Sequence, residues 1–121
     1  SVAIVHDDPL FLGIAAAALR DAGHDVVAFD DSMTALNEIN AAGHFEVLIT
    51  RVSFPEGKPN GASLALVLRN KYPRLKAIFA ARAEWQTHLE GIGELIPHPG
   101  DMPQLVAPVT RAAEEGRRSS I

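Results

Sequence analysis

The chain contains no cysteine and few aromatic residues. Phe, Trp and Tyr make up 6% of its 121 residues. Without thiols there is no disulfide framework and no thiolate metal site, and this composition fits a reducing compartment. We therefore expect a cytoplasmic protein.

The sequence also lacks a basic cluster and a long hydrophobic run. Eleven Lys and Arg against fifteen Asp and Glu give a formal net charge of -4, so the electrostatic footprint of a nucleic-acid-binding protein is missing. The longest apolar run, Leu10 to Leu19, is about half as long as a bilayer crossing requires. We expect no direct nucleic-acid partner, no membrane segment and no targeting leader.

What the chain does contain is enough apolar sequence for one core. Hydrophobic residues make up 47% of it, which suits a single domain of this length. We expect this domain to span residues 1–116. The polar end "EEGRRSSI" indicates a flexible tail or linker stub over residues 117–121.

Short β-rich apolar runs alternate with longer stretches of helical spacing, and Gly or Pro separates most of them. A helix is expected after each of five predicted strands, which are Val2–Val5, Asp25–Phe29, Phe45–Thr50, Leu75–Ala80 and Glu94–Pro97. Fully apolar strands in repeated β-α units predict a parallel sheet with helices on both faces. The expected fold class is therefore a three-layer, doubly wound α/β domain.

Ligands of such folds bind at the carboxyl ends of the central strands. His6, Asp7 and Asp8 follow the first predicted strand, and Arg51 follows the third. Asp8, directly before Pro9, can also cap the helix that follows. Arg51 is unusual because a permanently charged guanidinium ends the apolar run "VLIT". The strand ends are therefore where we expect the functional site.

The strand-end residues resemble the site of the receiver domains of bacterial response regulators, and the resemblance runs from about Val2 to Ala113. It implies a flavodoxin-like (βα)5 fold with strand order 2-1-3-4-5. By this resemblance, His6 and Asp7 stand where the family has an acidic pair, and Arg51 stands where it has the phosphoacceptor aspartate. Ala81 (or Ala80 in a shifted register) replaces the family's Thr or Ser, and His98-Pro99 replaces its Lys-Pro pair. A cis peptide bond before Pro99 is also implied.

The chain resembles the family in its pattern of strands and helices but lacks most of the family's reactive side chains. Phosphoryl transfer in the family needs a carboxylate nucleophile, Mg²⁺ held by carboxylate oxygens, and a cation and a hydroxyl that grip the phosphoryl group. A guanidinium has no acceptor lone pair, so Arg51 cannot be the nucleophile. We therefore expect a degenerate pseudo-receiver with no aspartyl phosphorylation, no Mg²⁺, no catalytic residue, no cofactor and no enzymatic turnover.

Arg51 can instead replace the metal as a counter-ion. We expect it to form an internal ion pair with Asp7 and Asp8 that holds the domain in one state. The expected partners are proteins of a signalling pathway, or an attached output or kinase domain. The chain could also form a homodimer.

Two alternatives remain open at this stage. An unorthodox phosphoryl carrier could use Asp7, Asp8 or a histidine. A sensor domain could bind a small ligand or metal in the strand-end pocket, with His6, His98 and Asp7 as ligands of Zn²⁺. The two histidines could also make the pocket sensitive to pH near neutrality.

Two further expectations concern helices near the carboxyl end of the chain. Trp85, His88, Leu89 and Ile92 have the spacing of one apolar helical stripe. Pro108 lies inside the last predicted helix, where it should kink the helix or delay its start.

Overall fold

Five parallel strands form one sheet in the computed structural model, which describes residues 1–54, 57–98 and 101–119, with side chains in the last helix as far as Glu115. From edge to edge the strands are β2 (Val26–Phe29), β1 (Val2–Val5), β3 (Val47–Thr50), β4 (Lys76–Ala81) and β5 (Glu94–Pro97). The order β2-β1-β3-β4-β5 confirms the predicted flavodoxin-like topology.

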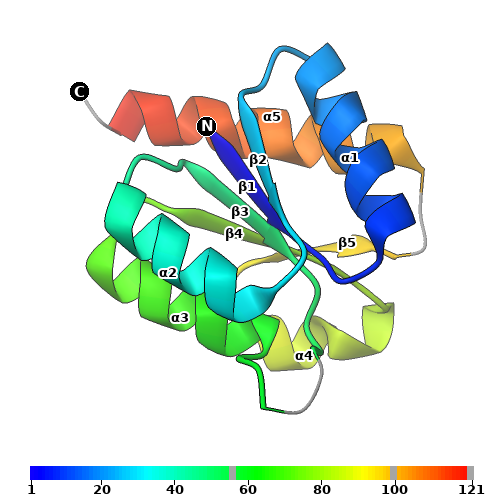
Figure 1. Cartoon of the computed structure of the whole chain (residues 1–121). Helices are drawn as coiled ribbons and strands as arrows, with labels where there is room; N and C mark the ends of the chain where they lie inside the picture. Colours follow the sequence, from blue (N-terminus) through cyan, green and yellow to red (C-terminus); the bar gives the residue numbers. More distant parts are fainter. Residues whose placement is uncertain (55–56, 99–100, 120–121) are drawn as a thin grey trace.

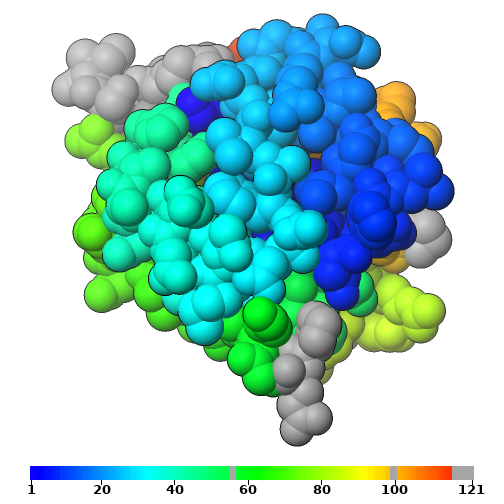
Figure 2. Space-filling model, viewed as in Figure 1, coloured from blue at the N-terminus to red at the C-terminus, as the bar shows by residue number. Residues whose placement is uncertain are grey.

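Helices cover both faces of the sheet (Figure 1). One face carries α1 (Pro9–Asp21) and α5 (Met102–Ser119), and the other carries α2 (Ser32–Ala42), α3 (Gly61–Lys71) and the short α4 (Gln86–Leu89). A 3₁₀ turn, η1 (Ala83–Trp85), precedes α4. In the space-filling view, the side chains of α1 (blue) and α2 (cyan) lie on either side of the edge strand β2 (Figure 2).

Alternation along the strands divides the core into two layers. Val2 and Ile4 of β1 pack in the layer beneath α1 and α5, whereas Ala3 and Val5 pack in the layer beneath α2 and α3. All four side chains are fully buried. Strands buried on both faces need apolar residues at every position, which explains the unbroken hydrophobic runs in the sequence.

Side-chain caps start the helices immediately after the strand-end loops. Asp8, Asp31 and Asn60 have extended backbones, and each accepts a hydrogen bond from a backbone N–H in the first turn of α1, α2 and α3, respectively. Gly43 ends α2 in the left-handed conformation, with φ of 71°. The short loops thus return the chain sharply from each strand to its helix.

Gly61 fixes the connection between β3 and α3. Its N–H donates to the carbonyl of Val52 at 2.7 Å, and a Cβ at this position would lie 1.8 Å from the carbonyl oxygen of Arg51. Only glycine allows so close an approach. Lys58 also pairs with Asp31 at 2.9 Å, which ties this connection to the start of α2.

Three expectations near the carboxyl end differ from the structure. The stripe from Trp85 to Ile92 differs at one residue: Trp85, Leu89 and Ile92 pack in the layer beneath α2 and α3, whereas His88 is exposed, and α4 itself has four residues. A start of α5 delayed by Pro108 is wrong, because Asp101 and Gln104 exchange hydrogen bonds that begin the helix at Met102. Helix α5 then runs to Ser119, into the segment expected as a tail.

Candidate functional site

The parallel sheet brings four strand ends to one edge. Val5 of β1 lies level with Thr50 of β3, and Ala81 of β4 lies level with Pro97 of β5. The residues that follow these strands are therefore neighbours although they are far apart in the sequence. We call this region the strand-end site and describe it from Arg51 outward.

Arg51 and Asp7 contact each other across the ends of β3 and β1. Nη1 of Arg51 lies 2.5 Å from Oδ1 of Asp7. Their side chains are 37% and 31% exposed, respectively. Thr50 fixes the backbone here, because its hydroxyl donates to the Arg51 carbonyl at 2.9 Å. The guanidinium therefore occupies the edge where the expected phosphoacceptor position lies.

Asp8 does not take part in this ion pair, so that part of the expectation is wrong. Its Oδ1 accepts a hydrogen bond from the N–H of Leu10 at 3.1 Å, at the beginning of α1. An extended backbone at a helix N-cap directs the carboxylate toward the first helical turn. Asp8 therefore caps α1. Among the described acidic residues, Asp7 alone faces Arg51.

His6 is a buried histidine with a defined tautomer. Its Nδ1 accepts the N–H of Asp8 at 3.0 Å, so the ring proton is on Nε2. This nitrogen is buried without a hydrogen-bond partner in the described part of the chain. Burial first, and then the charges of Arg51 and His98, lower the pKa of His6 from 6.5 to about 4. The ring is therefore neutral at physiological pH.

His6, Phe11 and His98 form a cluster of three rings beside the ion pair. The ring centroid of Phe11 lies 4.5 Å from that of His6 and 4.7 Å from that of His98. The two imidazoles are 5.3 Å apart, centroid to centroid. Phe11 reaches this cluster from α1 and packs against both histidines.

Ala81 and His98 occupy the ends of β4 and β5. Ala81 is buried, and its carbonyl accepts the N–H of His98 at 3.1 Å. A methyl group thus lies where the resemblance places a hydroxyl. Pro99, the expected cis-proline, lies outside the described residues.

A pocket of about 380 Å³ opens at the strand-end site. Its described lining consists of Arg51, Val52, Ser53, Ala80, Ala81, Arg82, Trp85 and His98. Sequence reasoning did not assign Arg82 or Ser53 to the site. Arg82 could have been found from its place directly after the fourth strand, whereas Ser53 carries no distinguishing signal.

The donor set at this edge does not fit Mg²⁺, which prefers several hard oxygen ligands. Asp7 is the one described carboxylate at the pocket edge that is not committed to a helix cap, and it faces a guanidinium. No group of three or more His, Asp or Glu side chains is placed to hold a metal within residues 1–54, 57–98 and 101–119.

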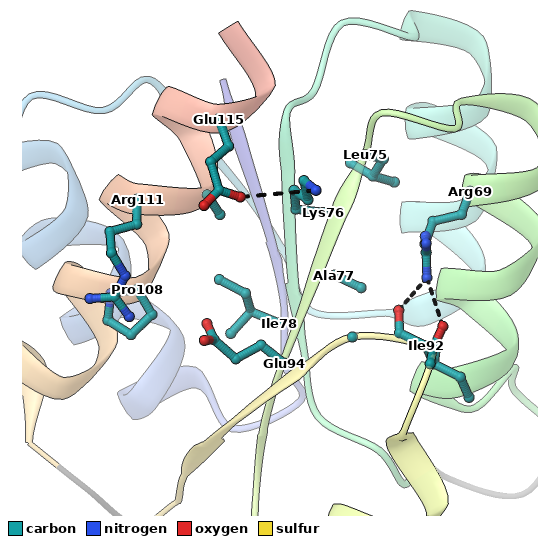
Figure 3. Close-up of a pocket in the computed structure, with 13 residues that line it drawn as sticks. Arg69, Leu75, Lys76, Ala77, Ile78, Ile92, Glu94, Pro108, Arg111 and Glu115 are labelled. Carbon is teal, nitrogen blue, oxygen red and sulfur yellow. Dashed lines mark hydrogen bonds and ion pairs between the residues drawn. The ribbon is translucent and has the colours of Figure 1, made fainter. Parts of the chain in front are cut away.

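A second pocket, of about 390 Å³, lies at the opposite ends of β4 and β5, beside α5 (Figure 3). Both charge signs line it. Lys76 lies 4.0 Å from Glu115, and Glu94 of β5 and Arg111 of α5 point into the space between these elements. Arg69 closes one side by donating to the carbonyls of Gly91 and Ile92.

The helices give no sign of a membrane segment. Among the described residues, no helix is both long and apolar enough to cross a bilayer.

Comparison with known proteins places the fold. No protein-family model and no curated protein sequence matches the chain. A CheY-like response regulator receiver domain from Methanospirillum hungatei is similar in structure, with a TM-score of 0.84 and 19% identity over 98% of this chain and 96% of that one. The receiver domain of an HD domain-containing protein from Pseudomonas fluorescens has a TM-score of 0.82 and 16% identity over 97% and 96%.

NtrX from Brucella abortus also matches, with a TM-score of 0.84 and 19% identity. The match covers 98% of this chain but 28% of NtrX, so in that protein the similar fold is one part of a longer chain. The chain therefore has the fold of the response regulator receiver domains.

Proposed function

We propose that the chain is a receiver-like regulatory module of the two-component type that works through protein contacts, without phosphorylation on aspartate and without Mg²⁺. The observation that carries this proposal is the guanidinium of Arg51, 2.5 Å from Asp7 at the edge where the receiver fold holds its reactive site. The proposed partners are proteins of a signalling pathway or an attached output or kinase domain.

The absence of a nucleophile supports this proposal. Arg51 is protonated at any biological pH and offers no lone pair for attack on phosphorus. Asp7 is the remaining carboxylate at the site, and its Oδ1 is engaged by Arg51. Asp8 is engaged at the start of α1, and His6 is buried. These contacts argue against a phosphoryl carrier based on Asp7, Asp8 or His6.

The positive charge of Arg51 also argues against Mg²⁺ binding at the site. A divalent cation beside Asp7 would have to displace a guanidinium at 2.5 Å or tolerate its positive charge. Arg51 instead supplies the counter-charge from within the chain. A site neutralised in this way has no need of a metal, and the domain remains in a single state.

The switching residues are changed as well. The buried methyl group of Ala81 and the imidazole of His98 offer neither the hydroxyl nor the lysine ammonium that the resemblance implies. Among the described residues of the strand-end site, we find no group that could sense a phosphoryl group in the family's way. We therefore assign the chain no turnover and a constitutive conformation that partners recognise.

Amide NMR spectra of the isotope-labelled chain test this function. We expect Mg²⁺ to leave the spectrum unchanged, both in the absence and in the presence of a small phosphodonor such as acetyl phosphate. Shifts of signals at the ends of β1, β3 and β4 in Mg²⁺ alone would contradict metal independence. Further shifts that appear only when Mg²⁺ and acetyl phosphate are present together would contradict the constitutive state.

A second candidate is a small-ligand sensor, which the open strand-end pocket of about 380 Å³ favours. Ligand sites of small molecules start at about this size. Both candidates use the same edge of the sheet but differ in what occupies it.

A further inference from the structure

The strand-end pocket has an unusual distribution of charge. Its described lining includes the side chains of Arg51, Arg82 and His98, and no acidic residue. The other large pocket, at the opposite ends of β4 and β5, is lined by Glu94 and Glu115 as well as by basic residues. The strand-end pocket is therefore the one with a cationic lining.

Both guanidinium groups have hydrogen-bonding capacity to spare. Arg51 meets Asp7 through Nη1, while a guanidinium carries five N–H donors. Arg82 lies 3.8 Å from Glu84, which is beyond hydrogen-bond distance, and their side chains are 77% and 70% exposed. Water screens so exposed a pair strongly, which leaves Arg82 able to turn toward an anion.

The remaining walls are aromatic and apolar. Trp85 is half-buried and lines the pocket together with the imidazole of His98. Val52, Ala80 and Ala81 are buried and provide an apolar surface. An aromatic wall beside two guanidinium groups suits a ligand that has a flat apolar part and an anionic part.

We propose that the strand-end pocket reversibly binds a compact phosphomonoester that carries a flat apolar group. Arg51 and Arg82, at the ends of adjacent strands, grip the phosphate, and Trp85 packs against the apolar group. A phosphate monoester offers three terminal oxygens and up to two negative charges, which suits two guanidiniums better than a carboxylate does. The proposal rests on the second candidate function, the ligand sensor, and is independent of the first.

Fluorescence of Trp85, the single tryptophan of the chain, provides the test. Phenyl phosphate and inorganic phosphate are titrated into the chain at constant ionic strength, and phosphorus NMR of the same samples detects binding independently. We expect saturable binding of both, tighter for phenyl phosphate. Arg82→Gln should weaken it about tenfold, since it removes one charge-assisted contact.

Arg74→Gln is the matched control. Arg74 is exposed and lies just before β4, at the end of the sheet opposite the pocket, so this variant should bind like the original chain. Circular dichroism of both variants checks that they are folded. The intact mass after titration separates reversible binding from covalent phosphorylation, so failure of this proposal differs from failure of the first proposed function.

Three results would overturn the proposal. The first is the absence of saturable binding by both fluorescence and phosphorus NMR. The second is equal affinity in the Arg82→Gln variant, and the third is equal affinity for phenyl phosphate and inorganic phosphate, which would remove Trp85 from the site.

Discussion

At the scale of single residues, Arg51 changes the chemistry of the strand-end site. It places a permanent cation 2.5 Å from Asp7. The pair lies partly in solvent, with side-chain exposures of 37% and 31%. Its main effect is therefore that the guanidinium fills the site, and it adds little to the stability of the fold. Ion pairs of this exposure contribute little to stability.

Removing the pair should therefore have a small energetic effect. We expect Arg51→Gln to lower the free energy of unfolding by about 0.2–1 kcal/mol, as for other exposed pairs. Urea unfolding of Arg51→Gln, Asp7→Asn and the double variant measures the coupling directly. High salt should reduce the coupling by screening. Zero coupling at low salt would show that the two side chains do not interact in solution.

The buried His6 predicts a specific dependence of stability on pH. Its pKa in the folded state, about 4, lies below its usual 6.5. Between these values the unfolded state binds the proton more readily, so stability is full above pH 6.5 and is lost as pH falls toward 4. The slope for one proton reaches about 1.4 kcal/mol per pH unit.

His6→Asn checks this dependence, because an Asn oxygen can accept the N–H of Asp8 that Nδ1 of His6 accepts. Unfolding midpoints in urea are compared from pH 7 to pH 4 for both chains. The variant should lose less stability over this interval. The charged neighbours of position 6, which are Arg51, His98, Asp7 and Asp8, are the same in both chains. Parallel curves would therefore refute a neutral, buried His6.

At the scale of elements, the connection from β3 to α3 determines where Arg51 lies. The carbonyl of Arg51 packs against Gly61, where there is no room for a Cβ. The N–H of Gly61 also holds the carbonyl of Val52. The orientation of Arg51 therefore depends on a glycine ten positions later in the chain.

Two glycine substitutions test this dependence. Gly61→Ala should lower the free energy of unfolding by about 1–3 kcal/mol, because the new methyl group meets backbone that cannot move aside freely. Gly13→Ala is the control: it lies in α1 with no atom within 4 Å of the new Cβ, so it should raise stability by up to about 1 kcal/mol. Equal effects in thermal unfolding would contradict the tight packing at Gly61.

The elements themselves were largely predictable from the sequence. Apolar runs bounded by Gly and Pro located all five strands, since a strand buried on both faces requires such a run. For Asp8 the sequence allowed two roles, since an acidic residue before Pro9 can either cap a helix or join an ion pair. The helix cap is confirmed and the ion pair is wrong, because the direction of α1 decides between them. Helical spacing placed Ile92 on the stripe of the fourth helix; α4 ends at Leu89, and Ile92 packs in the same core layer from beyond the helix.

At the scale of the whole molecule, the fold and the chemistry are separable. The five-stranded sheet and its two helical layers match receiver domains at 15–20% identity in the structures compared. The core sets this architecture, whereas the residues after the strands set the site. The resemblance predicted which positions meet. Arg82 could have been added from its place after the fourth strand, but the position of Trp85 in the pocket depends on the path of the chain after β4.

This separation predicts that restoring one residue does not restore the receiver chemistry. Arg51→Asp reinstates a carboxylate at the end of β3, beside Asp7. Ala81 and His98 still lack the hydroxyl and the ammonium group that a receiver uses. We expect the variant to remain unmodified by a small phosphodonor in the presence of Mg²⁺, as judged by intact mass. A covalent adduct on this variant would show that the carboxylate alone was missing.

The most direct test of the proposed function is the intact mass of the unaltered chain after incubation with acetyl phosphate and Mg²⁺. A known phosphorylatable receiver domain, treated in parallel, shows that the phosphodonor is active. Arg51 is paired to Asp7, and we propose that it stands at the family's phosphoacceptor position, so we predict no phosphoryl adduct. A stoichiometric adduct that is labile to hydroxylamine, as an acyl phosphate is, would contradict this account.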